Sequence, residues 1–142
     1  MRISDVLRIK GGQVVTVTPT VDVGHLLNVL AEHRIGAVVV SADGNSVDGI
    51  VSERDVVRKL NGNDEILEAT VDQIMTAVVQ TCEPGQDVDE LMVQMTERRI
   101  RHVPVVDGDN LVAVISIGDV VKSRITQLEF ERDQLDSYVH QT

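Results

Sequence analysis

The chain contains an internal duplication, and this feature constrains its fold more than any other. Pro19 and Pro84 each end a short strand-like segment, and they lie 65 positions apart. The apolar residues that follow each proline correspond pair by pair at the same offset: Val23 with Val88, Leu26 with Leu91, Leu27 with Met92 and Leu30 with Met95. A correspondence that continues over so long a stretch indicates one α/β unit that is present twice and packs against its copy.

Each copy shows the pattern β-α-β-β-α. The predicted strands cover residues 14–17, 37–41 and 47–51 in the first copy and residues 79–81, 103–106 and 111–115 in the second. Apolar residues at helical spacing follow the first strand of each copy, and Asp22 or Asp87 stands at the expected N-cap. The predicted fold class is therefore α/β (α+β), with two β-α-β-β-α repeats and a C-terminal helical tail.

Four segments follow from this pattern. They are a first repeat with its N-terminal segment over residues 1–62, a linker with a short helix over 63–78, a second repeat over 79–122 and a helical tail over 123–142. Residues 3–7 resemble residues 71–75, so the segments ahead of the two copies also correspond. The tail has apolar residues at helical spacing between acids and arginines. This pattern predicts a helix that extends past the core and joins two copies into a homodimer.

The charge and the residue content argue against several classes of function. The chain has 23 acidic and 13 basic residues, and its net charge of −10 opposes non-specific binding to nucleic acid. Cys82 is the only cysteine, so neither an intrachain disulfide nor a CxxC metal site is expected. No apolar run reaches transmembrane length and no signal peptide is evident, which predicts a cytoplasmic protein without a membrane partner.

Two Ser-x-x-Asp motifs stand at equivalent positions of the repeats, where a strand leads into a helix: Ser52 to Asp55 and Ser116 to Asp119. One interpretation is a capping box, in which the serine and the acid satisfy free amides of the first helical turn. The other is a ligand site, in which the helix N-terminus and the serine bind phosphate and the acid accepts ribose hydroxyls. The recurrence of the motif favours the second interpretation and leaves the first open.

Basic residues gather near the same positions. Arg101 and His102 immediately precede a buried strand of the second copy, and Arg54 and Arg58 fall on the first turns of the helix after Ser52. Surface arginines are commonly just solvated, but a cluster at the end of a strand suits phosphate better than it suits a core. His102 could act as a base. No nucleophile, paired carboxylate or metal-ligand spacing accompanies it, so an enzyme is not expected.

With these motifs the chain resembles the cystathionine-β-synthase (CBS) domain family, as a stand-alone tandem pair. The resemblance runs from Ile3 to Lys122 and is carried by residues 34–40, 49–55, 101–106 and 114–119. It implies that the two copies pack through their sheets as a pseudo-two-fold, disc-like pair with two composite clefts. It also implies a regulatory sensor without catalysis, which binds adenosine-containing ligands such as AMP, ADP, ATP, NAD or S-adenosylmethionine.

The resemblance assigns ligand-binding residues from both copies to each cleft. One cleft would combine Ser52, Arg54 and Asp55 with Thr81, Cys82, Arg101, His102, Val103 and Pro104. The other would combine Ser116, Gly118 and Asp119 with Thr16, Thr18, Gly36, Ala37 and Val38. In both clefts the aspartate would hold the ribose, the serine would approach phosphate, and β-branched strand residues would enclose the adenine.

The two clefts are not expected to bind alike, because Glu53 and Arg54 in one repeat replace Ile117 and Gly118 in the other. Gly118 opens the cleft around Asp119, which favours AMP there, with NAD or ATP as alternatives. The ligand would act on a separate, unidentified protein effector, because no effector domain is attached. The alternative function is a structural dimerisation module with empty clefts, in which the Ser-x-x-Asp motifs only cap helices.

Overall fold

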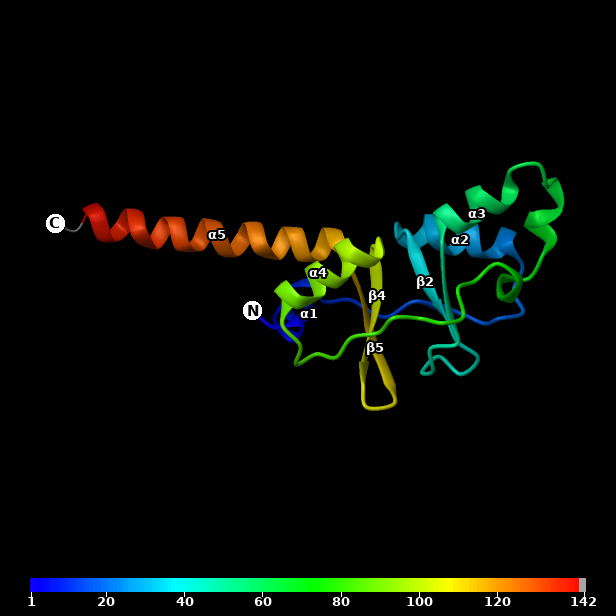
Figure 1. Ribbon diagram of the computed structural model, residues 1–142, viewed down its shortest axis with the longest axis horizontal. Helices are drawn as coiled ribbons and strands as arrows, with labels where there is room; N and C mark the ends of the chain where they lie inside the picture. The colour runs from blue at the N-terminus through cyan, green and yellow to red at the C-terminus, as the bar shows by residue number, and fades with distance from the viewer. Residues whose placement is uncertain (141–142) are drawn as a thin grey trace.

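The first repeat folds as a small sheet with helices packed beside it. In the computed structural model, which describes residues 1–140, β1 (Thr16–Val17) pairs in parallel with β2 (Ala37–Val40), and β2 pairs antiparallel with β3 (Gly49–Ser52). Helix α2 (Val23–His33) connects β1 to β2, and α3 (Glu53–Leu60) follows β3 (Figure 1). All four residues of β2 are buried, as is typical of a strand covered on both faces.

The second repeat has the same order of elements with one difference. Its elements are α4 (Val88–Arg98), β4 (His102–Asp107) and β5 (Asn110–Ser116), with β4 and β5 antiparallel. The strand predicted over residues 79–81 is wrong, since pairing there is limited to one bridge between Cys82 and Val105. Beyond Cys82 the chain turns away from the sheet, and the Pro84 carbonyl accepts the amide of Ser4 instead. The predicted α+β fold of two repeats is otherwise confirmed.

Both central helices begin at the predicted aspartate and end at an arginine. The side chains of Asp22 and Asp87 each accept a main-chain amide of the first turn at 2.7 Å. Arg34 and Arg99 cap the other ends, with φ of 54° and 55°. They are the only non-glycine residues with positive φ within the described part of the chain. This left-handed conformation normally favours glycine, so both helix ends place an arginine in a disfavoured geometry.

The segment ahead of each repeat packs in the core of the other repeat. Helix α1 (Ile3–Lys10) buries Ile3 and Val6 among the apolar residues of α4, β4 and β5. In the reciprocal arrangement, Val71 and Ile74 of the linker pack in the core of the first repeat. The two repeats therefore exchange equivalent segments, and each core depends on residues from the other half of the chain.

Main-chain hydrogen bonds hold both exchanged segments in the same way. The carbonyl of Met1 accepts the amide of Val88 at 3.0 Å, and the carbonyl of Ala69 accepts the amide of Val23 at 2.9 Å. The predicted linker helix takes the form of two short 3₁₀ helices, η1 (Asp64–Glu68) and η2 (Val71–Gln73). Packing thus runs across the segment boundaries predicted from the repeat.

The hairpin turns of the two sheets also contact each other. The amide of Leu111 donates to the carbonyl of Asn45 at 3.1 Å, and the Asn45 side chain donates to that of Asn110 at 2.8 Å. These bonds join the turn between β2 and β3 to the β4–β5 hairpin. They hold the two sheets side by side at the end opposite to the point where β3 and β5 lead into their following helices (Figure 1).

Helix α5 (Ile117–His140) continues from β5 and projects away from both repeats (Figure 1). The predicted tail helix is therefore present over the described residues, and residues 141–142 of the predicted tail segment lie outside them. Its apolar side chains Val121, Ile125, Leu128 and Leu135 are between 43% and 65% exposed. Across residues 1–140, no helix has the length and hydropathy needed to cross a membrane.

Candidate ligand-binding clefts

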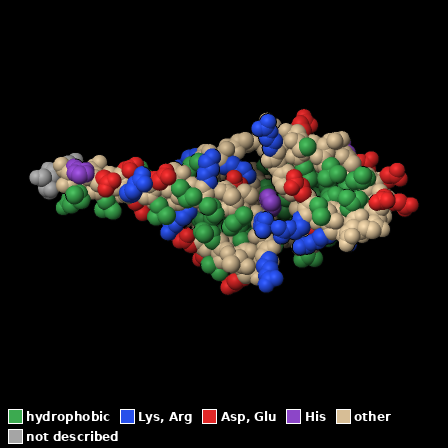
Figure 2. Space-filling model, turned by 90° about the horizontal axis from the view of Figure 1, so that it is seen from above, with side chains coloured by type: hydrophobic (Ala, Val, Ile, Leu, Met, Phe, Trp, Pro, Cys, Tyr) green, Lys and Arg blue, Asp and Glu red, His purple; other side chains and the backbone are tan. Residues whose placement is uncertain are grey.

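Two clefts lie where the repeats meet, and they share Gly36, Ala37 and His102 as a common wall. A Cβ atom added at Gly36 would lie 3.4 Å from Cε1 of His102, so the two repeats come nearly into van der Waals contact here. Seen from above, Lys and Arg side chains gather over this junction (Figure 2). The clefts are named below by their most distinctive residues, as the Asp119 cleft and the arginine cleft.

The Asp119 cleft has a volume of about 390 Å³ and brings together four of the predicted residues. They are Gly36, Ala37, Ser116 and Asp119. The other four predicted residues lie outside its lining: Thr16, Thr18, Val38 and Gly118. The Val38 side chain is fully buried in the core of the first repeat, which leaves no part of it facing the cleft. The lining also includes residues 10–15, which the sequence did not indicate.

The arginine cleft has a volume of about 420 Å³ and brings together five of the predicted residues. They are Ser52, Arg54, Asp55, Arg101 and His102. The remaining predicted residues lie outside its lining: Thr81, Cys82, Val103 and Pro104. Cys82 and Val103 are buried in the core of the second repeat. Two further arginines, Arg58 and Arg99, complete the basic lining.

The Ser-x-x-Asp motifs form capping boxes in both clefts. In the first, Asp55 Oδ2 accepts the Ser52 amide at 2.8 Å, and Ser52 Oγ accepts the Asp55 amide at 3.3 Å. In the second, the corresponding distances between Ser116 and Asp119 are 2.9 and 3.1 Å. Each carboxylate uses Oδ2 for these bonds, and within residues 1–140 its Oδ1 atom has no hydrogen bond. Capping therefore leaves each aspartate able to accept further donors from a ligand.

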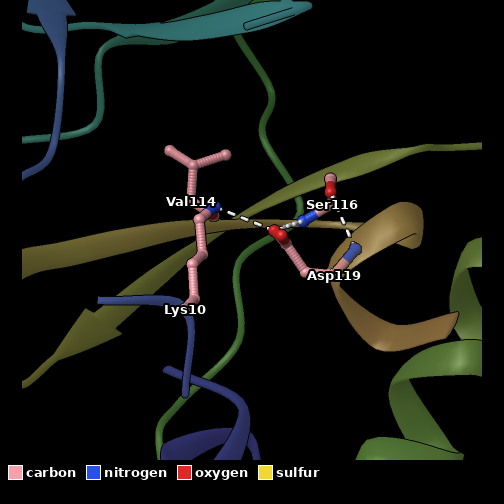
Figure 3. Close-up of polar contacts among 4 residues, drawn as sticks. All are labelled: Lys10, Val114, Ser116 and Asp119. Atoms are coloured by element: carbon pink, nitrogen blue, oxygen red, sulfur yellow. Dashed lines mark hydrogen bonds and ion pairs between the residues drawn. The ribbon is translucent and has the colours of Figure 1, made fainter. Parts of the chain in front are cut away.

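Lys10 reaches the Asp119 cleft from α1 and holds Asp119 in place. Its Nζ atom donates to Oδ2 of Asp119 at 2.8 Å and to the carbonyl of Val114 at 2.5 Å (Figure 3). Gly11 and Gly12, with φ of 61° and 88°, form the turn that follows Lys10 along the cleft wall. The contact exists only because α1 packs on the opposite repeat, 109 residues from Asp119 in sequence.

Burial and neighbouring charges in the Asp119 cleft shift the pKa values of Asp119 and His102. Burial opposes ionisation of Asp119, but the hydrogen bonds from Lys10 and Ser116 outweigh this effect and hold the pKa of the carboxyl below its ordinary value. Burial, followed by the charge of Lys10, lowers the pKa of His102. At neutral pH the cleft therefore offers an ionised carboxylate and a neutral imidazole. Among residues 1–140, no group of three His, Cys, Asp or Glu side chains is placed to hold a metal ion.

Cys82 is expected to react slowly with alkylating agents in the folded protein. Burial raises the pKa of its thiol to about 12. At pH 8 only about one thiol in 10⁴ would be ionised, against roughly a quarter for an exposed cysteine. Iodoacetamide labelling followed by mass spectrometry should show at least a roughly 10³-fold slower reaction than in denaturant. Equal rates in both conditions would contradict the buried, uncharged environment.

Comparison with known families gives one consistent result. The family described as CBS domain matches the chain twice, over residues 3–62 and 71–125. The curated relatives include the mitochondrial CBS domain-containing protein CBSX3 of Arabidopsis thaliana. It is 33% identical over 96% of this chain and 71% of its own length.

Solved structures show the same fold. A CBS-domain containing protein from Agrobacterium tumefaciens superposes with a TM-score of 0.83 at 45% identity, over 87% of this chain and 99% of that one. A CBS domain pair solved in complex with 5-methylthioadenosine and S-adenosyl-L-methionine superposes with a TM-score of 0.77 at 22% identity, over 89% of this chain and 98% of that one. At 22% identity, this similarity shows a shared fold.

Proposed function

Because this chain belongs to the CBS domain family, we propose that it is a non-catalytic regulatory module that binds an adenosine-containing ligand in its two clefts. The observation that carries the proposal is the pair of Ser-x-x-Asp motifs. Each lines a cleft between the repeats, and each aspartate keeps one carboxylate oxygen for a ligand. The solved pair that holds 5-methylthioadenosine and S-adenosyl-L-methionine supports this class of ligand.

In this proposal the aspartates accept the ribose hydroxyls and the serines lie next to phosphate. AMP is the favoured ligand of the Asp119 cleft, and NAD and ATP are the alternatives. The ribose hydroxyls can donate to the free Oδ1 atom of Asp119, while its Oδ2 atom keeps the contacts with Lys10 and Ser116. The predicted residues that lie outside the cleft linings, such as Val38 and Val103, stay predictions from the family resemblance.

Replacing both aspartates is the direct test of this site. The double variant Asp55→Ala/Asp119→Ala should bind AMP, ATP, NAD or S-adenosylmethionine on the order of 10- to 100-fold more weakly at each cleft, because charge-assisted hydrogen bonds to ribose are lost. Isothermal titration calorimetry with each of the four ligands measures this change. Wild-type binding with an unchanged affinity in the variant would reject the assignment of the aspartates.

A matched variant separates ligand binding from helix capping. Asp22→Ala/Asp87→Ala likewise removes two aspartates that cap helix starts, here from the N-cap position, and these helices begin away from the cleft linings. Both double variants should lose about 0.5–2 kcal/mol of stability per cap, and only the first should lose affinity. If no ligand binds or raises the melting temperature of the wild type, the alternative of a structural dimerisation module is the better account.

We also propose that the chain is a homodimer joined through α5. Val121, Leu128 and Leu135 recur every seven residues along this helix and form one stripe with Ile125. Lys122 and Arg124 lie near its start, whereas Glu129, Glu131, Asp133 and Asp136 lie further along. An antiparallel pair of α5 helices brings opposite charges together, and a parallel pair brings like charges together. The protein effector and the cytoplasmic location stay predictions from the sequence.

A further inference from the structure

The arginine cleft has more positive charge than the Ser-x-x-Asp motif requires. Arg54, Arg58, Arg99 and Arg101 line it, against two acids, Glu53 and Asp55. Within residues 1–140, none of the four arginines forms an ion pair. This is notable in a chain of 23 acids and 13 bases, where acidic partners are abundant. The guanidinium groups are thus gathered in one concave site and left available to an anion.

The backbone at Arg99 adds an independent observation. Arg99 ends α4 in the left-handed conformation, with φ of 55°, at a helix end where glycine is the usual residue. A side chain with a Cβ atom is disfavoured there, and within residues 1–140 only Arg34 shares this feature. Arg34 lines the Asp119 cleft and Arg99 lines the arginine cleft. Each disfavoured residue therefore presents a cation to a candidate ligand site.

The two clefts differ in how much of this charge is available. In the Asp119 cleft, Lys10 is already paired with Asp119 at 2.8 Å. Arg34 is therefore the one basic lining residue of this cleft, within residues 1–140, that remains available to an anion. In the arginine cleft, four arginines belong to the lining, and none of them forms an ion pair within residues 1–140. Each guanidinium can bind two phosphate oxygens in a planar, two-pronged contact. A single phosphate cannot engage four such groups, whereas a chain of linked phosphates can.

We propose that the arginine cleft is specific for a ligand with a chain of two or three linked phosphates, as in a nucleoside di- or triphosphate. This inference rests on the proposed function for the ribose contact of Asp55 and goes beyond it in naming the phosphate chain as the selected group. Arg58 and Arg99 are its specificity-determining residues, added to Arg54 and Arg101. The Asp119 cleft accordingly takes the ligand of lower charge.

The test compares ligands that differ only in their phosphates. Magnesium-free titrations with AMP, ADP, ATP and inorganic tripolyphosphate are made on the wild type and on Arg58→Gln/Arg99→Gln. The wild-type arginine cleft should bind ATP at least about 10-fold more tightly than AMP, and the variant should lose on the order of 10- to 100-fold for ATP. In the same variant, the affinity of the Asp119 cleft for AMP should change less than about 2-fold, since neither arginine lines that cleft. The variant Arg58→Lys/Arg99→Lys keeps the charge and should recover only part of the affinity.

A tail variant is the matched control. Arg124→Gln/Arg132→Gln removes the same charge from the exposed α5 helix, away from both clefts, and should leave ATP affinity unchanged. Equal affinities for AMP and ATP, or an equal loss in the cleft and tail variants, overturn the inference while the aspartate test of the proposed function can still succeed. Arginine-dependent binding of tripolyphosphate without binding of any nucleotide supports the anion site and rejects the adenosine ligand.

Discussion

Replacing Ile3 by alanine is expected to destabilise the protein by about 2–5 kcal/mol, although Ile3 lies in the first turn of an N-terminal helix. Its side chain is fully buried, and it packs in the core of the second repeat with Val88 and Val103. Truncation leaves a cavity in a core whose other buried members, apart from Val6 of the same helix, come from residues 82–120. Chemical denaturation measures the loss of stability. Hydrogen exchange should show that the amides of β4 and β5 lose protection first.

A neighbouring apolar residue of the same helix supplies the control. Ile9 is 59% exposed, so Ile9→Ala should change stability by no more than about 0.5 kcal/mol. The reciprocal variant Val71→Ala should weaken the core of the first repeat, where Val71 is buried. Loss of protection confined to β1–β3 in the Ile3→Ala protein would contradict the exchange of segments between the repeats.

The sequence predicts the elements whose signals are local. The N-cap aspartates and the apolar spacing place α2 and α4 correctly, because both signals act within one or two helical turns. The strands after them are found for the same reason. The strand predicted at 79–81 does not form in the structure, because strand pairing depends on a partner that is distant in sequence. In the structure only Cys82 meets that partner, and Pro84 bonds to α1 instead.

The residues of the candidate site also fall into two groups, those that a local motif predicts and those that depend on distant packing. Ser52, Asp55, Ser116 and Asp119 line the clefts because a motif at equivalent repeat positions points to equivalent places in the fold. Lys10 could not be placed, since its contact with Asp119 depends on which repeat α1 covers. The resemblance of residues 3–7 to residues 71–75 was the available signal, because equivalent segments are expected to pack in equivalent ways.

Alternation along the strands explains why the clefts leave out Val38 and Val103, which follow the lining residues Ala37 and His102. Neighbouring strand residues point to opposite faces, so a continuous run of predicted ligand residues cannot all face one cleft. Val103 points into the core, while His102 before it lines both clefts. Arg99 lies two residues before Arg101 in the sequence, among other basic residues. Its left-handed backbone, which distinguishes it from a solvated arginine, appears only in the structure.

Placing acids on the apolar stripe of α5 is expected to convert the protein from a dimer to a monomer. Leu128 is 50% exposed and Leu135 is 65% exposed, so neither contributes much to the fold of a single chain. In an antiparallel pair, both leucines of both helices become buried, and each is worth about 1.5–3 kcal/mol. Leu128→Glu/Leu135→Glu should therefore raise the dimer dissociation constant by at least about 100-fold, as measured by sedimentation equilibrium, with an unchanged circular dichroism spectrum.

The opposite face of the same helix provides the control and the orientation. Phe130 is 62% exposed and lies about 180° around the helix from Val121, so Phe130→Glu should leave the dimer intact.

Antiparallel pairing places Lys122 near Asp136 of the second copy, because the helix of 24 residues is then reversed about Leu128. Asp136→Lys should weaken the dimer, and adding Lys122→Glu should restore it. A monomeric wild type, or equal effects of the changes on both faces, would show that α5 does not pair two copies through this stripe.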